Sequence, residues 1–124
     1  MYKGEFMYIR KLTETILYAA QKFPVVTLTG PRQSGKTTLL RNLYPERAYV
    51  TLEDLDTRAY AKEDPRGFLA QFSDGVILDE AQHVPELFSY IQSHVDEKKQ
   101  MGEFILSGSQ NMLLSEKIAQ SLAG

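Results

Sequence analysis

The sequence has 124 residues, of which 43% are hydrophobic and 24% are charged, as is typical of a folded globular protein. This length leaves room for one domain of ordinary size, and the composition excludes disordered, collagen-like and low-complexity proteins. The formal net charge is −2 and the basic residues are scattered, which argues against a polybasic surface for nucleic acid or membranes. The chain lacks cysteine, so disulfides and thiolate metal sites are excluded. Because no secretory signal or membrane-spanning run is evident, we expect a cytoplasmic protein.

The first part of the chain alternates between helical and strand patterns. Apolar residues recur at helical spacing from about residue 8 to residue 23, which predicts an N-terminal helix within residues 1–23. The apolar, β-branched run at 25–29 predicts a parallel strand that is covered on both faces. A second helix is expected to begin in the stretch 35–38 and to end near residue 43, before a second strand at 48–52.

The middle of the chain predicts an interrupted helix and a third strand. Residues 54–72 have a helical pattern with a break at Pro65. The continuous apolar run 76–78 predicts a buried strand, and a hairpin turn at Asp74-Gly75 is the alternative interpretation of this segment.

The last part of the chain repeats the alternation of helix and strand. A helix is expected from Leu87 to the lysines at 98–99, a fourth strand at 104–106 and a final helix at 113–124. His94, in the first of these helices, is expected to be a surface residue. Strands that alternate with helices predict an α/β domain with a mostly parallel sheet, because parallel strands need crossover connections.

Residues 30–37 match the phosphate-loop motif G-x-x-x-x-G-K-[ST] without a gap, between a predicted strand and a predicted helix. Gly30 and Gly35 allow the backbone to curl closely around phosphate oxygens. Lys36 is expected to reach the β- and γ-phosphates, and the Thr37 hydroxyl is expected to bind Mg²⁺. We assign nucleotide binding to Gly30, Pro31, Arg32, Gln33, Ser34, Gly35, Lys36, Thr37 and Thr38.

The motif does not determine the roles of three side chains in this segment. Arg32 and Gln33 are expected either to be exposed on the loop or to contact phosphate or a neighbouring subunit. Thr38 is expected to pack rather than to contact the ligand through its side chain.

Two adjacent carboxylates follow the third strand. Asp79 is placed to hold Mg²⁺ directly or through water, and Glu80 is placed to orient and polarise an attacking water. The alternative is a solvated strand end. His83, a little further on, either caps the loop before Pro85 or relays contact to the γ-phosphate.

Polar residues also follow the fourth strand. Ser107 and Ser109, with Gln110 beside them, lie where a sensor would contact the γ-phosphate or the lytic water, or they form a simple turn. The predicted catalytic residues are therefore Glu80, Lys36 and Ser109, and the predicted metal ligands are Thr37 and Asp79.

Other nucleotide-dependent classes fit less well. Residues 79–83 resemble the D-E-A-H box of helicases, but the histidine comes one position late and the chain is too short for a second helicase domain. The N-K-x-D motif of GTPases does not occur, which favours ATP over GTP. The paired carboxylates suit water activation better than transfer of phosphate to a metabolite.

Taken together, the chain resembles the AAA-type P-loop ATPases of bacteria and archaea that carry a C-terminal DUF4143 domain. The resemblance is carried by Phe23-Pro24-Val25-Val26, the segment 28–38, Leu52-Glu53-Asp54, Asp64-Pro65, the segment 77–82 with Pro85, and Leu106-Ser107-Gly108-Ser109-Gln110.

The resemblance implies a three-layer α/β core of the additional-strand type with sheet order 5-1-4-3-2. It also implies that the fifth strand, later arginine and sensor elements and the C-terminal domain lie beyond this sequence, so the chain is expected to be a C-terminally truncated part of a longer protein. An uncovered edge of the first strand would then favour self-association, and the missing arginine implies slow hydrolysis.

The sequence therefore predicts Mg²⁺-dependent ATP binding with slow ATP hydrolysis. The alternative is a switch or scaffold that binds ATP without significant hydrolysis. The expected ligands are ATP and Mg²⁺, with an unidentified protein partner and no membrane or nucleic-acid partner.

Overall fold

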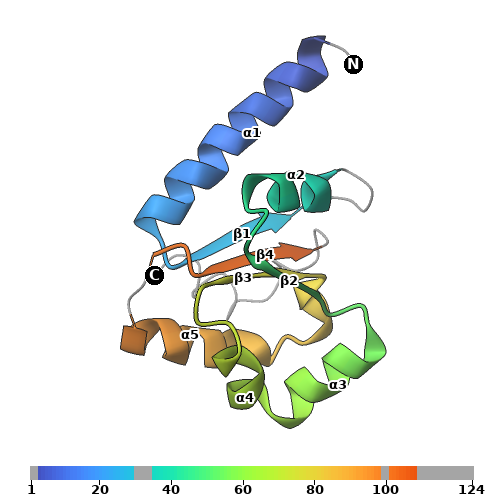
Figure 1. Cartoon of the computed structure of the whole chain (residues 1–124), viewed down its shortest axis with the longest axis vertical. Helices are drawn as coiled ribbons and strands as arrows, with labels where there is room; N and C mark the ends of the chain where they lie inside the picture. The colour runs from blue at the N-terminus through green and yellow to red at the C-terminus, as the bar shows by residue number, and fades with distance from the viewer. Residues whose placement is uncertain (1–2, 30–34, 99–100, 109–124) are drawn as a thin grey trace.

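Helices and strands alternate along the chain in the computed structural model, which describes residues 3–29, 35–98 and 101–108 (Figure 1). The predicted helix at 113–124 lies outside the described residues. In chain order the elements are α1 (Lys3–Lys22), β1 (Val25–Thr29), α2 (Lys36–Leu43), β2 (Ala48–Thr51), α3 (Leu55–Glu63), α4 (Pro65–Ala70), β3 (Val76–Asp79), the 3₁₀ helix η1 (Ala81–His83), α5 (Leu87–Lys98) and β4 (Phe104–Gly108).

The four described strands form one parallel sheet in the order β1-β4-β3-β2. This order agrees with the 1-4-3-2 part of the arrangement that the family resemblance implies. It confirms the α/β fold class and shows that the hairpin at Asp74-Gly75 is wrong, because β3 runs parallel to both of its neighbours. In the described part of the chain, β1 and β2 form the two edges of the sheet.

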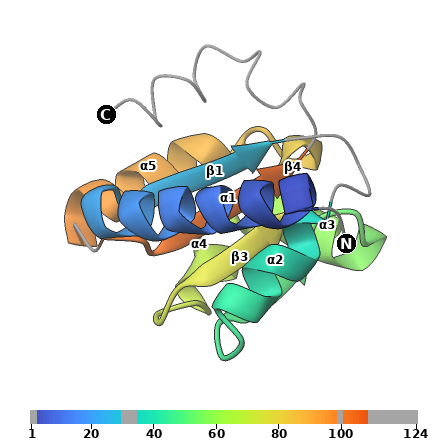
Figure 2. The same ribbon diagram turned by 90° about the horizontal axis from the view of Figure 1, so that it is seen from above.

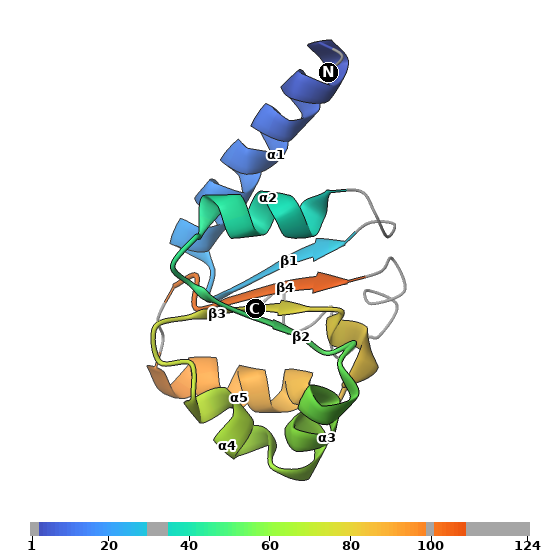
Figure 3. The same ribbon diagram turned by 45° about the vertical axis from the view of Figure 1, so that its right-hand side comes forward.

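The helices cover the sheet on both faces. Helices α1 and α2 lie on one side, and α3, α4 and α5 lie on the other (Figures 1 and 3). Viewed from above, α1 and α2 lie in front of the strands and α5 lies behind them, and α1 reaches beyond the sheet at its N-terminal end (Figures 1 and 2). The molecule therefore has the three layers expected of an α/β sandwich.

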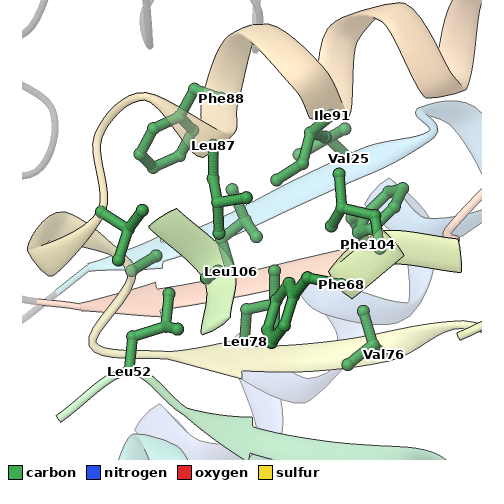
Figure 4. Close-up of a cluster of buried hydrophobic side chains, with 14 of the residues drawn as sticks. Val25, Leu52, Phe68, Val76, Leu78, Leu87, Phe88, Ile91, Phe104 and Leu106 are labelled. Atoms are coloured by element: carbon green, nitrogen blue, oxygen red, sulfur yellow. The ribbon is translucent and has the colours of Figure 1, made fainter. Parts of the chain in front are cut away.

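Alternation of side chains along the strands divides the core into two clusters. Ile77 and Ile105 point to the α1 and α2 side, where they pack with Ile16, Val26 and Leu40. Their strand neighbours point to the opposite side and form the larger cluster with α3, α4 and α5 (Figure 4). Labelled members of that cluster are Val25, Leu52, Phe68, Val76, Leu78, Leu87, Phe88, Ile91, Phe104 and Leu106. Strands that are apolar on both faces therefore occupy the centre of the fold.

The interrupted helical pattern after β2 becomes two helices with separate caps. Asp54 caps α3 by accepting hydrogen bonds from the amide and hydroxyl of Thr57, at 2.9 and 2.8 Å. Pro65 begins α4, and Asp64 caps it through the amide of Gly67. The predicted break at Pro65 is thus confirmed as the junction between two helices.

His94 is not the surface residue that the sequence predicts. Its Nε2 atom lies 2.8 Å from Oε2 of Glu103, and the two side chains are 17% and 0% exposed. The other carboxyl oxygen, Oε1, is buried and has no hydrogen-bond partner among the described residues. The His94 ring also meets Phe104 edge to face. The prediction failed because the partner lies on the loop before β4, which only the packing of α5 brings close.

We predict that His94→Ala destabilises the protein by about 2–4 kcal/mol, because the buried carboxyl group of Glu103 would lose its side-chain partner. Denaturant unfolding of the variant measures the loss. Ser93→Ala, at the exposed neighbouring position on α5, is the control. Equal stability of the two variants would contradict the structural role of the pair.

Candidate nucleotide-binding site

The carboxyl ends of the parallel strands meet at one edge of the sheet. Thr29 is in register with Gly108, and Thr51 is in register with Asp79. The described strand arrows all point to this edge, where α2 also begins (Figures 1 and 3). Ligands of open α/β sheets bind at such edges, particularly where neighbouring strands diverge in their connections.

The second half of the predicted phosphate loop lies at the start of α2. Gly35 has a positive φ of 84° and is the N-cap of the helix, a backbone conformation that favours glycine. The side chain of Lys36 is buried and Thr37 is partly buried, whereas Thr38 is exposed, so the expectation that Thr38 packs is wrong. The predicted contacts Gly30, Pro31, Arg32, Gln33 and Ser34 lie outside the described residues.

The Asp79 carboxylate connects the phosphate-loop helix to the sheet. The Thr37 hydroxyl donates to Oδ2 at 3.0 Å, and the Tyr49 hydroxyl donates to the same oxygen at 2.5 Å. The Ser107 hydroxyl and the backbone amide of Glu80 donate to Oδ1 at 2.7 and 2.9 Å. Both predicted metal ligands, Thr37 and Asp79, are therefore in direct contact.

These hydrogen bonds keep the carboxylate ionised although it is buried. Burial by itself would raise the pKa of Asp79, because a charge is less stable away from water. Hydrogen bonds from Tyr49, Ser107, Thr37 and the Glu80 amide outweigh burial and lower the pKa below the ordinary value for aspartate. An anionic oxygen is thus held beside the hydroxyl of the phosphate-loop threonine.

Tyr49 is a site residue that the sequence did not reveal. It lies on β2 and is in register with Ile77 on β3, two residues before Asp79. Burial, together with the nearby Asp79 charge, raises the pKa of the Tyr49 phenol, so the hydroxyl keeps its proton and acts as a donor. The guanidinium of Arg41 lies over its ring, 4.6 Å from the centroid. Finding Tyr49 would have required the pairing of β2 with β3.

Glu80 is buried and has a strained backbone. Its φ of 54° and ψ of 44° place it in the left-handed region, and it is the non-glycine residue with positive φ in the described part of the chain. Such a conformation costs roughly 1–3 kcal/mol and is typical of functional positions. The side-chain amide of Gln82 donates to Oε2 of Glu80 at 2.5 Å. The predicted general base therefore has a fixed position directly after the metal-binding candidate.

Of the predicted sensor residues and the nearby histidine, the structure describes only Ser107 and His83. Ser107 is fully buried on β4 and donates to Asp79, so its hydroxyl supports the carboxylate. Ser109, the predicted catalytic sensor, and Gln110 lie outside the described residues. His83 ends η1, and its Nε2 atom is buried without a hydrogen-bond partner among the described residues.

The donor set at this edge fits Mg²⁺. Magnesium prefers oxygen ligands and keeps several waters, so one or two protein oxygens are enough to bind it beside phosphate. The Thr37 hydroxyl and the Asp79 carboxylate supply such oxygens 3.0 Å apart.

The comparison with known families decides what kind of domain carries this site. A family model described as "AAA domain" matches residues 22–124, which include the phosphate loop, the acidic strand end and β4. The chain belongs to this AAA domain family. Membership indicates an AAA-type P-loop domain, and proteins of this family generally bind nucleotides. This agrees with the contact between Thr37 and Asp79 at the carboxyl edge of the sheet.

Two relatives of this AAA domain are uncharacterized mycobacterial proteins, Mb2031c of Mycobacterium bovis and Rv2008c of Mycobacterium tuberculosis. Each is 38% identical over 109 residues, which cover 86% of the chain and 24% of the relative. The chain thus spans about a quarter of the length of the curated relatives it matches. None of the described helices combines the length and apolar character needed to cross a bilayer.

We predict that Asp79→Asn lowers stability at neutral pH by about 1–3 kcal/mol, because the donors around the side chain lose a charged acceptor. The pKa of Asp79 is lower in the folded state, so its contribution is complete above the ordinary pKa of about 4 and is lost as pH falls through the folded-state value. The difference between wild type and variant should therefore be largest at neutral pH and shrink as the pH falls below about 4. Denaturant unfolding across this range measures it.

The exposed residue Asp74, in the turn before β3, offers the matched control. Asp74→Asn should change stability little at either end of the range. A destabilisation by Asp79→Asn that stays constant on acidification would contradict the assignment.

Proposed function

We propose that this AAA domain binds ATP with Mg²⁺ at the carboxyl edge of the sheet and hydrolyses it slowly. The observation that carries the proposal is the hydrogen bond between Thr37 and Asp79, which joins the helix of the phosphate-loop motif to the acidic strand end. The buried Glu80 follows directly on that strand. The preference for ATP over GTP rests on the family and on the absence of a guanine-reading motif.

Each residue then has a distinct chemical role. Lys36 places a positive charge at the β- and γ-phosphates, and the backbone around Gly35 faces the anion at the start of α2. Thr37 and Asp79 would hold Mg²⁺, which when bound neutralises charge on the β- and γ-phosphate oxygens.

Hydrolysis needs a water that is aligned with the γ-phosphorus. Glu80 accepts a proton as the water oxygen bonds to phosphorus and the bond from phosphorus to the bridging oxygen of ADP breaks. The side-chain amide of Gln82 donates a hydrogen bond to Oε2 of Glu80, and this contact restrains the carboxylate that accepts the proton. Slow turnover is consistent with that constraint.

The contact between Gln82 and Glu80 also favours the second candidate function. A domain in which Glu80 remains held would bind ATP and change partners without significant hydrolysis, as a switch or scaffold does. The protein partner of such a switch, and self-association through the β1 edge, remain predictions. Turnover separates the two functions, whereas binding is common to both.

We predict that the chain binds ATP in the presence of Mg²⁺ and that Lys36→Ala weakens this binding at least tenfold, because the charge facing the phosphates is removed. Calorimetric titration with ATP and with GTP measures both affinity and base preference. Lys62→Ala, at an exposed lysine of α3, should bind like wild type. Equal binding by Lys36→Ala, or none by the folded wild-type chain, would refute the proposed site.

We predict that Glu80→Gln leaves ATP affinity within about threefold of wild type but lowers turnover at least a hundredfold, because the amide cannot accept the proton from water. Phosphate release under single-turnover conditions is the measurement. Glu86→Gln, at an exposed neighbouring glutamate, is the matched control. If wild type and Glu80→Gln turn over equally, the switch is the better description.

A further inference from the structure

The hydroxyl of Tyr49 makes the shortest of the described hydrogen bonds to Asp79, and the proposed function gives it no role. It lies 2.5 Å from Oδ2, compared with 3.0 Å for the hydroxyl of Thr37. The following inference rests on the proposed function, because it concerns the Mg²⁺ affinity of the same site.

The acceptor capacity of Asp79 is already filled by protein donors. An ionised carboxylate has two oxygens with about four lone-pair sites. Tyr49 and Thr37 donate to Oδ2, while Ser107 and the Glu80 amide donate to Oδ1. Mg²⁺, or a water in its coordination shell, needs a lone pair on this carboxylate. One of these donors must therefore give way when the metal binds.

Tyr49 is the donor that can be replaced most easily. The oxygen of Thr37 has lone pairs of its own, so it can bind Mg²⁺ while its hydroxyl still donates a hydrogen bond to Asp79. Ser107 is fully buried on β4, and the Glu80 donor is a backbone amide next to Asp79. Both of these act on Oδ1, away from Thr37.

The position of Tyr49 allows its hydroxyl to move. Its side chain is only partly buried, and β2 is an edge strand of the described sheet. The ring packs at the margin of the α1 and α2 cluster with Arg41 over its face. A change of the χ1 torsion would withdraw the hydroxyl and leave the backbone of the strand in place.

We propose that the Tyr49 hydroxyl competes with Mg²⁺ for Oδ2 of Asp79 and thereby sets the metal affinity of the site. Tyr49 is a positioning residue, because it acts on the nucleotide through Asp79. It keeps the carboxylate oriented towards Thr37 until the metal replaces the Tyr49 hydroxyl as the partner of Oδ2. Removing the hydroxyl should therefore strengthen metal-dependent binding, whereas loss of a simple supporting contact would weaken it.

The test is Tyr49→Phe, which removes only the hydroxyl. The dissociation constant of a non-hydrolysable ATP analogue is measured by calorimetry in excess Mg²⁺ and again in EDTA. The ratio of the two constants reports how much Mg²⁺ strengthens binding. We expect this ratio to rise about tenfold in Tyr49→Phe, while binding in EDTA stays unchanged.

Tyr44→Phe provides a matched control. Tyr44 is also a partly buried tyrosine with an arginine over its ring, Arg47 at 4.6 Å, but it lies before β2, away from the carboxyl edge. Its ratio should equal that of wild type. If Tyr49→Phe is too unstable for titration, wild type, Tyr49→Phe and Tyr44→Phe are compared in a stabilising osmolyte such as TMAO.

Thermal unfolding supplies a second readout. In EDTA, Tyr49→Phe should have a lower melting temperature than wild type, because it lacks the hydrogen bond to Asp79. With saturating Mg²⁺ and the analogue the two melting temperatures should be equal, because the metal has displaced the Tyr49 hydroxyl from Asp79 in the wild-type protein as well. A deficit that persists in both conditions would overturn the inference and leave Tyr49 as a structural contact.

The outcomes separate the two proposals. Wild-type binding that Mg²⁺ strengthens, with an unchanged or lower ratio in Tyr49→Phe, overturns the competition and leaves the proposed function standing. Wild-type protein that does not bind the analogue, or binds it equally with and without Mg²⁺, overturns both.

Discussion

The buried Asp79 carboxylate is the group on which the geometry of the site depends. A buried charge is tolerated only when it is surrounded by hydrogen-bond donors. Here the donors come from α2, β2, β4 and the residue that follows β3, so three segments that are distant in sequence from Asp79 must converge on its side chain. The hydrogen bond from Thr37 to this carboxylate positions the start of α2 against the sheet.

The order of the strands makes this convergence possible. Because β4 lies between β1 and β3, Ser107 is beside Asp79 on the neighbouring strand. The alternation of side chains sends Tyr49, Ile77 and Asp79 to the same side of the sheet, the side that α2 covers. On this face of the sheet, the apolar residues of the strands thus form the core. Asp79, the polar residue at the end of β3, lies at the candidate site on the same face.

Glu80 combines a strained backbone with a side chain that is held by a hydrogen bond. The left-handed backbone turns the chain sharply as β3 ends, so that η1 begins directly afterwards. Gln82, two residues further on, holds the carboxylate of Glu80 from within this turn. Asp79 and Glu80 are adjacent in sequence but have separate environments, one surrounded by hydroxyl groups and an amide, the other held by a side-chain amide. That separation suits the roles proposed for them, a metal ligand and a proton acceptor.

The sequence by itself determined the class of fold and the two motifs of the site. The strand at 25–29 and the phosphate-loop motif are local patterns, and the run that ends at Asp79 is apolar because both faces of the strand are buried. Local patterns also placed the break at Pro65, since proline and its capping aspartate act on the nearest backbone.

Tertiary structure alone decided the contacts between distant strands and helices. The register of β2 against β3 brings Tyr49 to Asp79, and the packing of α5 buries His94 beside Glu103. Neither contact is visible in the sequence. Tyrosine and histidine occur both at the surface and in the interior, so their residue type and position in a strand or helix do not show whether they have a buried partner. The register and the packing angle result from filling the whole core, so the partners of these polar side chains follow from the complete fold.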